Sequence, residues 1–148
     1  MNWDSWIALV ALTLALAGLA LQWRRCLSRL EIEVGQGIPV YGQELGDVAL
    51  KIEVQNKRQT PTQLRSLTVV LPNGQSAIFR DPIAEKRLPC TLGPFESTMF
   101  MLPYRELAQT LKEQGSRGRA KVVVSIGDGS GRKHRGSHKI DVDEWADS

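Results

Sequence analysis

Residues 7–21 are the feature that most limits what this 148-residue chain can become. Thr13 is the one residue in this stretch that is neither apolar nor glycine, and tryptophans stand on both sides of it. At about 1.5 Å of rise per residue, a helix from the first of these tryptophans to the last is roughly 30 Å long, which matches the hydrocarbon core of a bilayer. The sequence therefore predicts a transmembrane helix with interfacial aromatic residues Trp3, Trp6 and Trp23.

The flanks of this segment distinguish a permanent anchor from a cleaved secretory signal. A signal peptide has a basic n-region and small residues at its cleavage site. Here the first five residues contain no Lys or Arg, and Gln22, Trp23 and Arg24 stand where cleavage would occur. We therefore expect residues 1–25 to remain attached as a membrane anchor. The alternative is a buried helix of a soluble protein, but such a helix is rarely apolar on every face.

The positions of Lys and Arg predict the orientation of the anchor. None of the 19 precedes the span, whereas Arg24, Arg25 and Arg29 follow it closely. Residues 26–29 form a short basic connector. Cytoplasmic flanks carry an excess of Lys and Arg. We therefore expect a single-pass protein of the bacterial inner (cytoplasmic) membrane, with its N-terminus outside and its C-terminal domain in the cytoplasm.

Small residues recur along one side of the predicted span. Ala8, Ala11, Ala15, Gly18 and Gln22 follow one another at alternating spacings of three and four. Small residues let two helix backbones approach closely in lipid, and a Gln side chain can hydrogen-bond across the contact. This stripe predicts a helix–helix interface, although a span rich in Ala and Leu also produces such a stripe by chance.

The charge of the soluble part limits the classes of partner. All 19 Lys and Arg lie after the span, together with every one of the 16 acidic residues except Asp4, which gives this part a net charge of +4. Such a charge suits a domain beside an anionic lipid surface and is too small to indicate nucleic acid. Cys26 and Cys90 do not make a disulfide framework, so we expect free thiols or, at Cys26, an acylated one.

Alternation of apolar and polar residues predicts a mainly β domain over residues 30–142. The clearest strand is 47–56, in which every second residue is aliphatic. Further strands are predicted at 30–34, 64–71, 77–79, 98–102, 121–126 and 132–142. One short amphipathic helix is predicted at 104–113, with Gly115 as its C-terminal cap.

Glycine and proline mark the segments between these strands. Residues 35–42 are expected to be an irregular edge, and residues 80–95 a loop with one short edge strand. Three glycines within 127–131 predict a flexible hairpin loop. Residues 143–148 are expected to form an acidic, frayed tail, with Trp145 as the one residue suited to docking on the domain.

Short strands separated by turn signals predict an antiparallel immunoglobulin-like (Ig-like) β-sandwich over residues 30–142, and a closed barrel is the alternative. Residues 56–61 lead into 64–74, and Leu92-Gly-Pro94, a helical corner and a Gly-rich hairpin follow. This pattern resembles the Ig-like domains of small single-span bacterial and phage membrane proteins of unknown function. The resemblance implies the architecture and no catalytic residue. The cysteine pair and core tryptophan of antibody domains do not occur in this pattern.

The sequence offers little that indicates catalysis or metal binding. His134 and His138 lie four residues apart on the last predicted strand, which separates them by about 13 Å, too far for one metal ion. Residues 128–131 have too few acidic side chains for a calcium loop. No phosphate-binding glycine loop or nucleophile elbow is present. We therefore expect no enzymatic activity, no metal or other cofactor and no small-molecule substrate.

One cluster of charge stands out at the start of the last predicted strand, where basic residues and a histidine occupy 132–135. These charges either keep an edge strand from pairing with other chains or contact the membrane. In an Ig-like domain, the loop after the second strand and the loop before the last one lie where the first strand begins. Each basic residue there contributes about 1 kcal/mol beside an anionic leaflet. The expected membrane-proximal basic residues are Arg24, Arg25, Arg29, Lys57, Arg58, Arg132, Lys133 and Arg135.

Together these features predict a membrane-tethered, non-enzymatic binding or scaffolding module that positions a protein partner at the membrane. The alternative is a structural subunit of a larger membrane or virion assembly, oligomerised through the small-residue stripe of its transmembrane helix. The expected partners are therefore the lipid bilayer and either a protein or a second copy of the chain, and not nucleic acid.

Overall fold

The computed structural model describes residues 2–26, 30–78 and 83–147. Helix α1 (Trp3–Cys26) contains the predicted span, and its residues Trp3–Arg24 are long and apolar enough to cross a membrane. None of that segment is buried against the rest of the chain. The hydroxyl of Thr13, in the middle of the helix, donates to the Leu9 carbonyl at 2.8 Å. The predicted apolar helix is therefore confirmed, and its outer surface is left without a protein covering.

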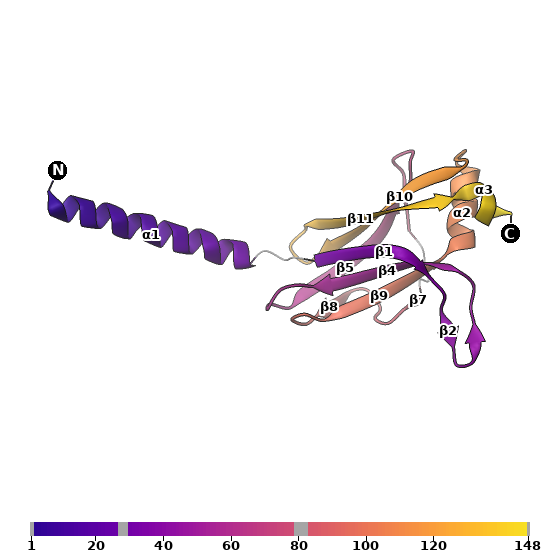
Figure 1. Cartoon of the computed structure of the whole chain (residues 1–148), viewed down its shortest axis with the longest axis horizontal. Coiled ribbons are helices and arrows are strands. Elements are labelled where there is room, and N and C mark those ends of the chain that lie inside the picture. Colours follow the sequence, from indigo (N-terminus) through magenta and orange to yellow (C-terminus); the bar gives the residue numbers. More distant parts are fainter. Residues whose placement is uncertain (1, 27–29, 79–82, 148) are drawn as a thin grey trace.

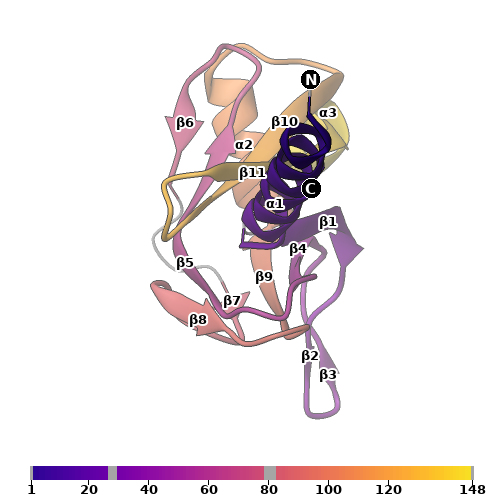
Figure 2. The same cartoon turned by 90° about the vertical axis from the view of Figure 1, so that its left-hand side faces the viewer.

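The remainder is mainly β, with two larger antiparallel sheets (Figure 1). The first has the order β1-β4-β9-β7, with bounds Leu30–Gly37, Ala49–Asn56, Ser97–Pro103 and Ile83–Ala84. The second has the order β11-β10-β5-β6, with bounds Lys133–Asp141, Arg119–Asp128, Thr62–Val70 and Ser76–Ala77, and β8 (Cys90–Leu92) also pairs with β5. Figure 2, viewed along the strands, shows the two sheets next to each other.

Alternate residues of both sheets form one hydrophobic core. Leu50, Ile52 and Val54 of β4 are fully buried, as their period of two predicts. Buried aliphatic residues of β10, such as Val122 and Ile126, belong to the same core. The two sheets meet most closely where β11 passes β1, because a Cβ added at Gly136 would lie 2.9 Å from Val34 Cγ2. A larger residue at Gly136 would have to push the two strands apart.

Two short helices cover one end of the domain. Helix α2 (Tyr104–Glu113) has the predicted bounds. Gly115 follows it with a φ of +84°, and the Ser116 N–H donates to the Leu111 carbonyl, which completes the C-terminal cap. Helix α3 (Val142–Ala146) lies where the sequence predicts a frayed tail, and this prediction is wrong. The domain therefore has two short helices instead of one. Trp145 does dock, with its ring 5.1 Å from that of Tyr104.

Two predicted loops contain more regular structure than expected. β1 continues to Gly37, and the supposed irregular edge forms a separate hairpin of β2 (Val40–Tyr41) and β3 (Glu44–Leu45). This hairpin projects beyond both larger sheets (Figure 2). The loop expected to contain one edge strand contains two, β7 and β8. Phe79, the last residue of the strand predicted at 77–79, lies outside the described residues.

Candidate functional site

Three loops meet at the end of the domain where β1 begins. Leu30 pairs with Asn56, so the loop 57–61 follows directly at this end. The Phe95 N–H donates to the Arg58 carbonyl at 3.3 Å, which brings in residues 93–96. The Gly129 N–H donates to the Gln63 carbonyl at 2.9 Å, which brings in the hairpin 128–132. We call the residues 57–61, 93–96 and 128–132 the anchor-side pole.

Asn56 holds the first of these loops in place from inside the domain. Its side chain is fully buried. The side-chain N–H donates to the carbonyls of Thr60 (2.9 Å) and Gly93 (3.1 Å), and its oxygen accepts from the Arg58 N–H at 3.1 Å. One buried amide therefore connects two loops and fixes the backbone that carries Lys57 and Arg58.

Asp128 holds the β10–β11 hairpin in the same way. Its carboxylate accepts from the N–H groups of Ser130 (2.9 Å) and Arg132 (3.0 Å) and from the Ser130 hydroxyl (2.6 Å). The second carboxylate oxygen lies 2.9 Å from Nε2 of His134. β10 continues through Asp128, so the expected flexible loop is an ordered turn around a buried carboxylate. Sequence reasoning missed this role, although Asp before Gly-Ser-Gly is a known turn signal.

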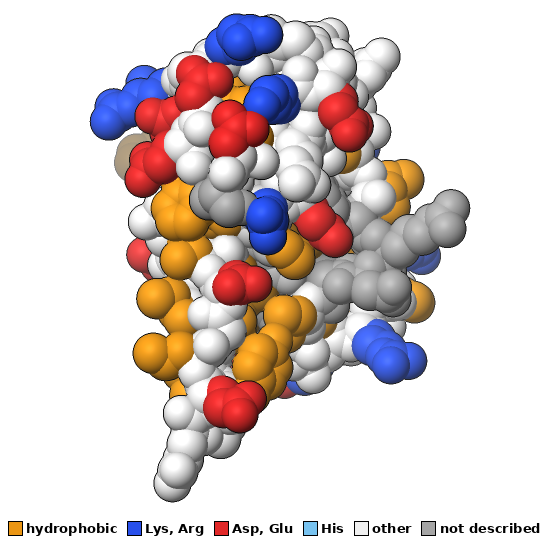
Figure 3. Space-filling model, turned by 90° about the vertical axis from the view of Figure 1, so that its right-hand side faces the viewer, with side chains coloured by type: hydrophobic (Ala, Val, Ile, Leu, Met, Phe, Trp, Pro, Cys, Tyr) orange, Lys and Arg blue, Asp and Glu red, His pale blue; other side chains and the backbone are white. Residues whose placement is uncertain are grey.

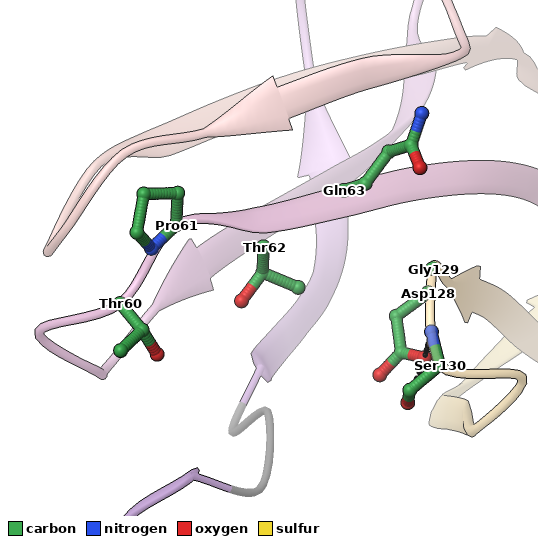
Figure 4. Close-up of a pocket in the computed structure, with 7 residues that line it drawn as sticks. All are labelled: Thr60, Pro61, Thr62, Gln63, Asp128, Gly129 and Ser130. Atoms are coloured by element: carbon green, nitrogen blue, oxygen red, sulfur yellow. Dashed lines mark hydrogen bonds between the residues drawn. The ribbon is translucent and has the colours of Figure 1, made fainter.

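A small pocket of about 220 Å³ lies between these loops, lined by Thr60–Gln63 and Asp128–Ser130 (Figure 4). This volume is below the roughly 300–1,000 Å³ of typical small-molecule sites. The carboxylate of Asp128 beside it is already engaged by the turn. Among the residues that the structure describes, no group of three or more His, Cys, Asp or Glu could hold a metal ion. The pocket therefore has no evident chemistry of its own.

The basic residues predicted to approach the membrane have different surroundings. Lys57 forms an ion pair with Glu31 at 3.2 Å, whereas Nη1 of Arg58 is buried without a hydrogen-bond partner in the described part of the chain. Arg132, Lys133 and Arg135 are exposed, and none of the ion pairs between described residues involves them.

The residues predicted on the helix are exposed wherever the structure describes their side chains. Arg24 and Arg25 lie in the last turns of α1, and Arg29 falls outside the described residues. The tryptophans at both ends of the helix, Trp3, Trp6 and Trp23, are exposed. The small-residue stripe is also exposed along its whole length, comprising Ala8, Ala11, Ala15, Gly18 and Gln22.

The opposite end of the domain contains an aromatic cluster. The Tyr104 hydroxyl of α2 lies 2.5 Å from Nε2 of His138 on β11, and Trp145 packs beside Tyr104. Burial raises the pKa of Tyr104 and lowers the pKa of His138, so both groups remain neutral near pH 7. These features favour a structural role for the cluster of Tyr104, His138 and Trp145.

Cys90 lies apart from this cluster, on β8. Burial raises the pKa of its thiol, which disfavours the reactive thiolate.

The hairpin β2–β3, which lies at this same end, exposes four large apolar side chains. Ile38 is 50% exposed, Val40 62%, Tyr41 54% and Leu45 75%. Figure 3 shows hydrophobic side chains gathering towards the projecting lower part of this end of the molecule. Sequence reasoning missed this surface, because Gly, Pro and Gln interrupt its strands and obscure their alternation.

Comparisons with known proteins leave the family open. No family model matches the chain, and no curated protein is similar to it. One solved structure that resembles it is described as the X-ray structure of Northeast Structural Genomics Consortium target SoR45. The match has 9% sequence identity and a TM-score of 0.36, and it covers 77% of this chain and 86% of that one.

Proposed function

We propose that this protein is a membrane-tethered, non-enzymatic binding module whose β2–β3 hairpin contacts a protein partner. The observation that carries the proposal is the exposed apolar surface of that hairpin, formed by Ile38, Val40, Tyr41 and Leu45. Val40 and Leu45 are paired across the hairpin, and neighbouring exposed apolar side chains mark interaction sites in soluble domains. The base of the hairpin is also closely packed, because a Cβ at Gly46 would lie 2.8 Å from the ring of Pro39 and 3.0 Å from that of Tyr41.

The position of the hairpin favours a protein over lipid as its partner. β1 runs from Leu30 to Gly37, so the hairpin begins about 23 Å along the strand from the end at which the anchor joins the domain. Exposed carboxylates of Glu44 and Asp47 flank its apolar side chains. An anionic lipid surface would repel these carboxylates, whereas a protein surface with apolar and basic residues would match them.

The proposal includes an Ig-like architecture for residues 30–142. The observed strand order β1-β4-β9-β7 corresponds to A-B-E-D of an Ig constant-type domain, and β11-β10-β5 corresponds to G-F-C. Domains of this kind commonly present loops and hairpins for recognition at their two ends. In this chain the A–B connection is the apolar hairpin, and the F–G connection is the turn around Asp128.

The proposal also includes a single crossing of the bacterial inner membrane by α1. Its support is the unburied apolar surface of α1 and the position of every Lys and Arg in its last turn or after it. The positive-inside rule then favours a cytoplasmic domain. Resistance of the full chain to carbonate extraction tests the crossing. Protection of the domain from protease in sealed right-side-out vesicles tests the orientation.

Photo-crosslinking in native membranes tests the role of the hairpin. A photoreactive amino acid replaces Leu45 on the hairpin or, as a control at the same end of the domain, Gln109 on the exposed side of α2. We expect one adduct of defined mass with a different protein from position 45 and none from position 109. Loss of this adduct in Val40→Ser would assign it to the apolar surface. Equal labelling from both positions would contradict the proposal.

A structural subunit of a larger assembly is the second candidate function. The exposed stripe on α1 favours it, and a Cβ added at Gly18 would meet no atom within 4 Å, so the groove there can accept a neighbouring helix. An adduct between two identical chains, formed through a crosslinker at position 18 and lost in Ala15→Leu, would support this candidate. The same experiment at Leu14, which is also exposed on α1, provides the control.

A further inference from the structure

The outer surface of the second sheet is basic along the length of β11 and β10. Alternate residues of these strands, such as Val122 and Ile140, are buried, and the residues between them point outward. The outward positions include five cationic side chains, which we call the basic face: Arg119, Lys121, Lys133, Arg135 and Lys139.

One of these charges, that of Arg119, lies opposite Asp141 in the sheet register, and the other four have no acidic residue opposite them on the neighbouring strand. The sheet register pairs Lys121 directly with Lys139, an arrangement in which two like charges repel each other. No ion pair between described residues involves any member of the basic face. Further along the same surface, the register aligns Arg135 with Ser125 and Thr68, which are neutral. The arrangement is therefore unfavourable unless an anionic surface lies against it.

The outer surface of the first sheet has the opposite charge. Glu31 and Glu33 of β1 and Glu53 of β4 point outward there, and Glu33 pairs directly with Glu53. Two of the three carboxylates have exposed ion pairs, Glu31 with Lys57 and Glu53 with Lys51, which are weak in water. The domain therefore has a basic side and a more acidic side, and an anionic surface would attract only the first.

We propose that the basic face lies flat on the anionic leaflet of the bilayer that α1 crosses. The inference rests on the proposed function, because it requires the domain to stay beside that bilayer. Three residues separate Cys26 from Leu30, so the chain can extend at most about 14 Å between the end of α1 and the start of β1. The lipid headgroups are therefore within reach of the domain at all times, and each cation that meets them strengthens the contact about fivefold.

This orientation differs from a contact made only by the anchor-side pole. In the pole contact, Lys57, Arg58 and Arg132 would meet the lipid, and Lys121 and Lys139 would not. In the flat orientation, Lys121 and Lys139 are central to the contact. The hairpin β2–β3 connects β1 to β4 of the acidic sheet, so the flat orientation leaves it accessible to a protein.

Lipid quenching of a site-specific fluorophore tests the orientation in the full chain reconstituted into vesicles. A fluorescent amino acid replaces Ser137, outward on β11, or Gln55, outward on β4. The vesicles contain nitroxide-headgroup lipid in phosphatidylcholine alone or with phosphatidylglycerol. We expect quenching at position 137 to increase at least twofold with phosphatidylglycerol and quenching at position 55 to stay constant. The increase should vanish at high salt.

Two pairs of substitutions separate the possible outcomes. Lys121→Gln with Lys139→Gln should remove the increase, and Lys57→Gln with Arg58→Gln should leave most of it. The reverse result, or equal quenching in both lipid mixtures, would overturn the flat orientation. Carbonate extraction of the same samples shows independently whether α1 is integrated. Failure of integration would reject the proposed function, whereas failure of quenching alone would reject only this orientation.

Discussion

The anchor-side pole and the β2–β3 hairpin distribute polar and apolar groups in opposite ways. At the pole, the buried polar side chains of Asn56 and Asp128 each hold a turn by three or more hydrogen bonds. At the hairpin, large apolar side chains such as Leu45 are exposed. Burial of a satisfied polar group contributes to stability, whereas exposure of an apolar group contributes nothing to the isolated domain. The polar residues of the pole therefore stabilise the fold, whereas the apolar residues of the hairpin are suited to contact with another molecule.

Among the polar residues that hold turns, the largest effect on stability is expected at Asp128. Asp128→Ala leaves the N–H groups of Ser130 and Arg132 and the ring of His134 without their acceptor, and we expect a loss of about 3 kcal/mol in the free energy of unfolding. Urea denaturation of the full chain in detergent, followed by circular dichroism, measures it. Asp147→Ala, which removes only an exposed ion pair with Lys112, is the matched control. Similar losses in both variants would contradict the role of Asp128.

A somewhat smaller loss is expected at Asn56. Asn56→Ala removes one acceptor and a donor that serves three carbonyls, which should lower the free energy of unfolding by about 2 kcal/mol. Hydrogen exchange of the Arg58 amide should also accelerate, because its acceptor is lost. Gln55→Ala, which changes the outward-pointing residue next to Asn56 on β4, is the control for both measurements. An unchanged exchange rate at Arg58 would show that the loop is held by other contacts.

The aromatic cluster at the hairpin end should make stability depend on pH. Burial lowers the pKa of His138 below its ordinary value of 6.5, so near that pH the unfolded chain binds more protons than the folded one. The free energy of unfolding should therefore fall as pH decreases from about 7.5 to 5.5. Denaturation at several pH values measures this slope. His138→Gln should reduce it, and an identical slope in that variant would assign the dependence to other groups.

The smallest effect on stability is expected on the hairpin. Leu45→Ser changes a side chain that is 75% exposed, so the free energy of unfolding should change by less than about 0.5 kcal/mol. Leu50→Ala, in the core, should cost about 2–5 kcal/mol in the same assay. Leu45→Ser should nevertheless abolish the adduct that a photoreactive amino acid placed at position 40 would form with the same partner. A large loss of stability in Leu45→Ser would mean that the hairpin supports the fold.

The parts of the fold that were predictable have strong local patterns. Three local patterns predict their elements directly, and the structure confirms each of them. They are the period of two in the strand within 47–56, the apolar run of helix α1 and the amphipathic spacing of helix 104–113 before Gly115. Helix α3 was not predictable, because five residues carry little periodicity and their docking depends on Tyr104 in another helix.

The parts of the candidate site that were missed depend on contacts between distant residues. The loops of the anchor-side pole could be placed together by topology, but the role of Asp128 depends on a hairpin that bonds to Gln63 and on a histidine from the next strand. The exposed apolar hairpin was missed for a different reason. An apolar residue in a short strand predicts burial by default, and its exposure can be seen only when the neighbouring strands are in place.

The tight passage of β11 over β1 at Gly136 has a consequence for self-assembly. Because these two strands shield each other, the long outer strands of both sheets are poor templates for the addition of a foreign strand. On their opposite sides the sheets end in β7, which has two residues, and in β6 and β8, which have two and three. These short strands offer too few backbone groups to nucleate a growing fibril. If α1 crosses a bilayer as proposed, the chain can thus reach high local density in that plane without polymerising through its backbone.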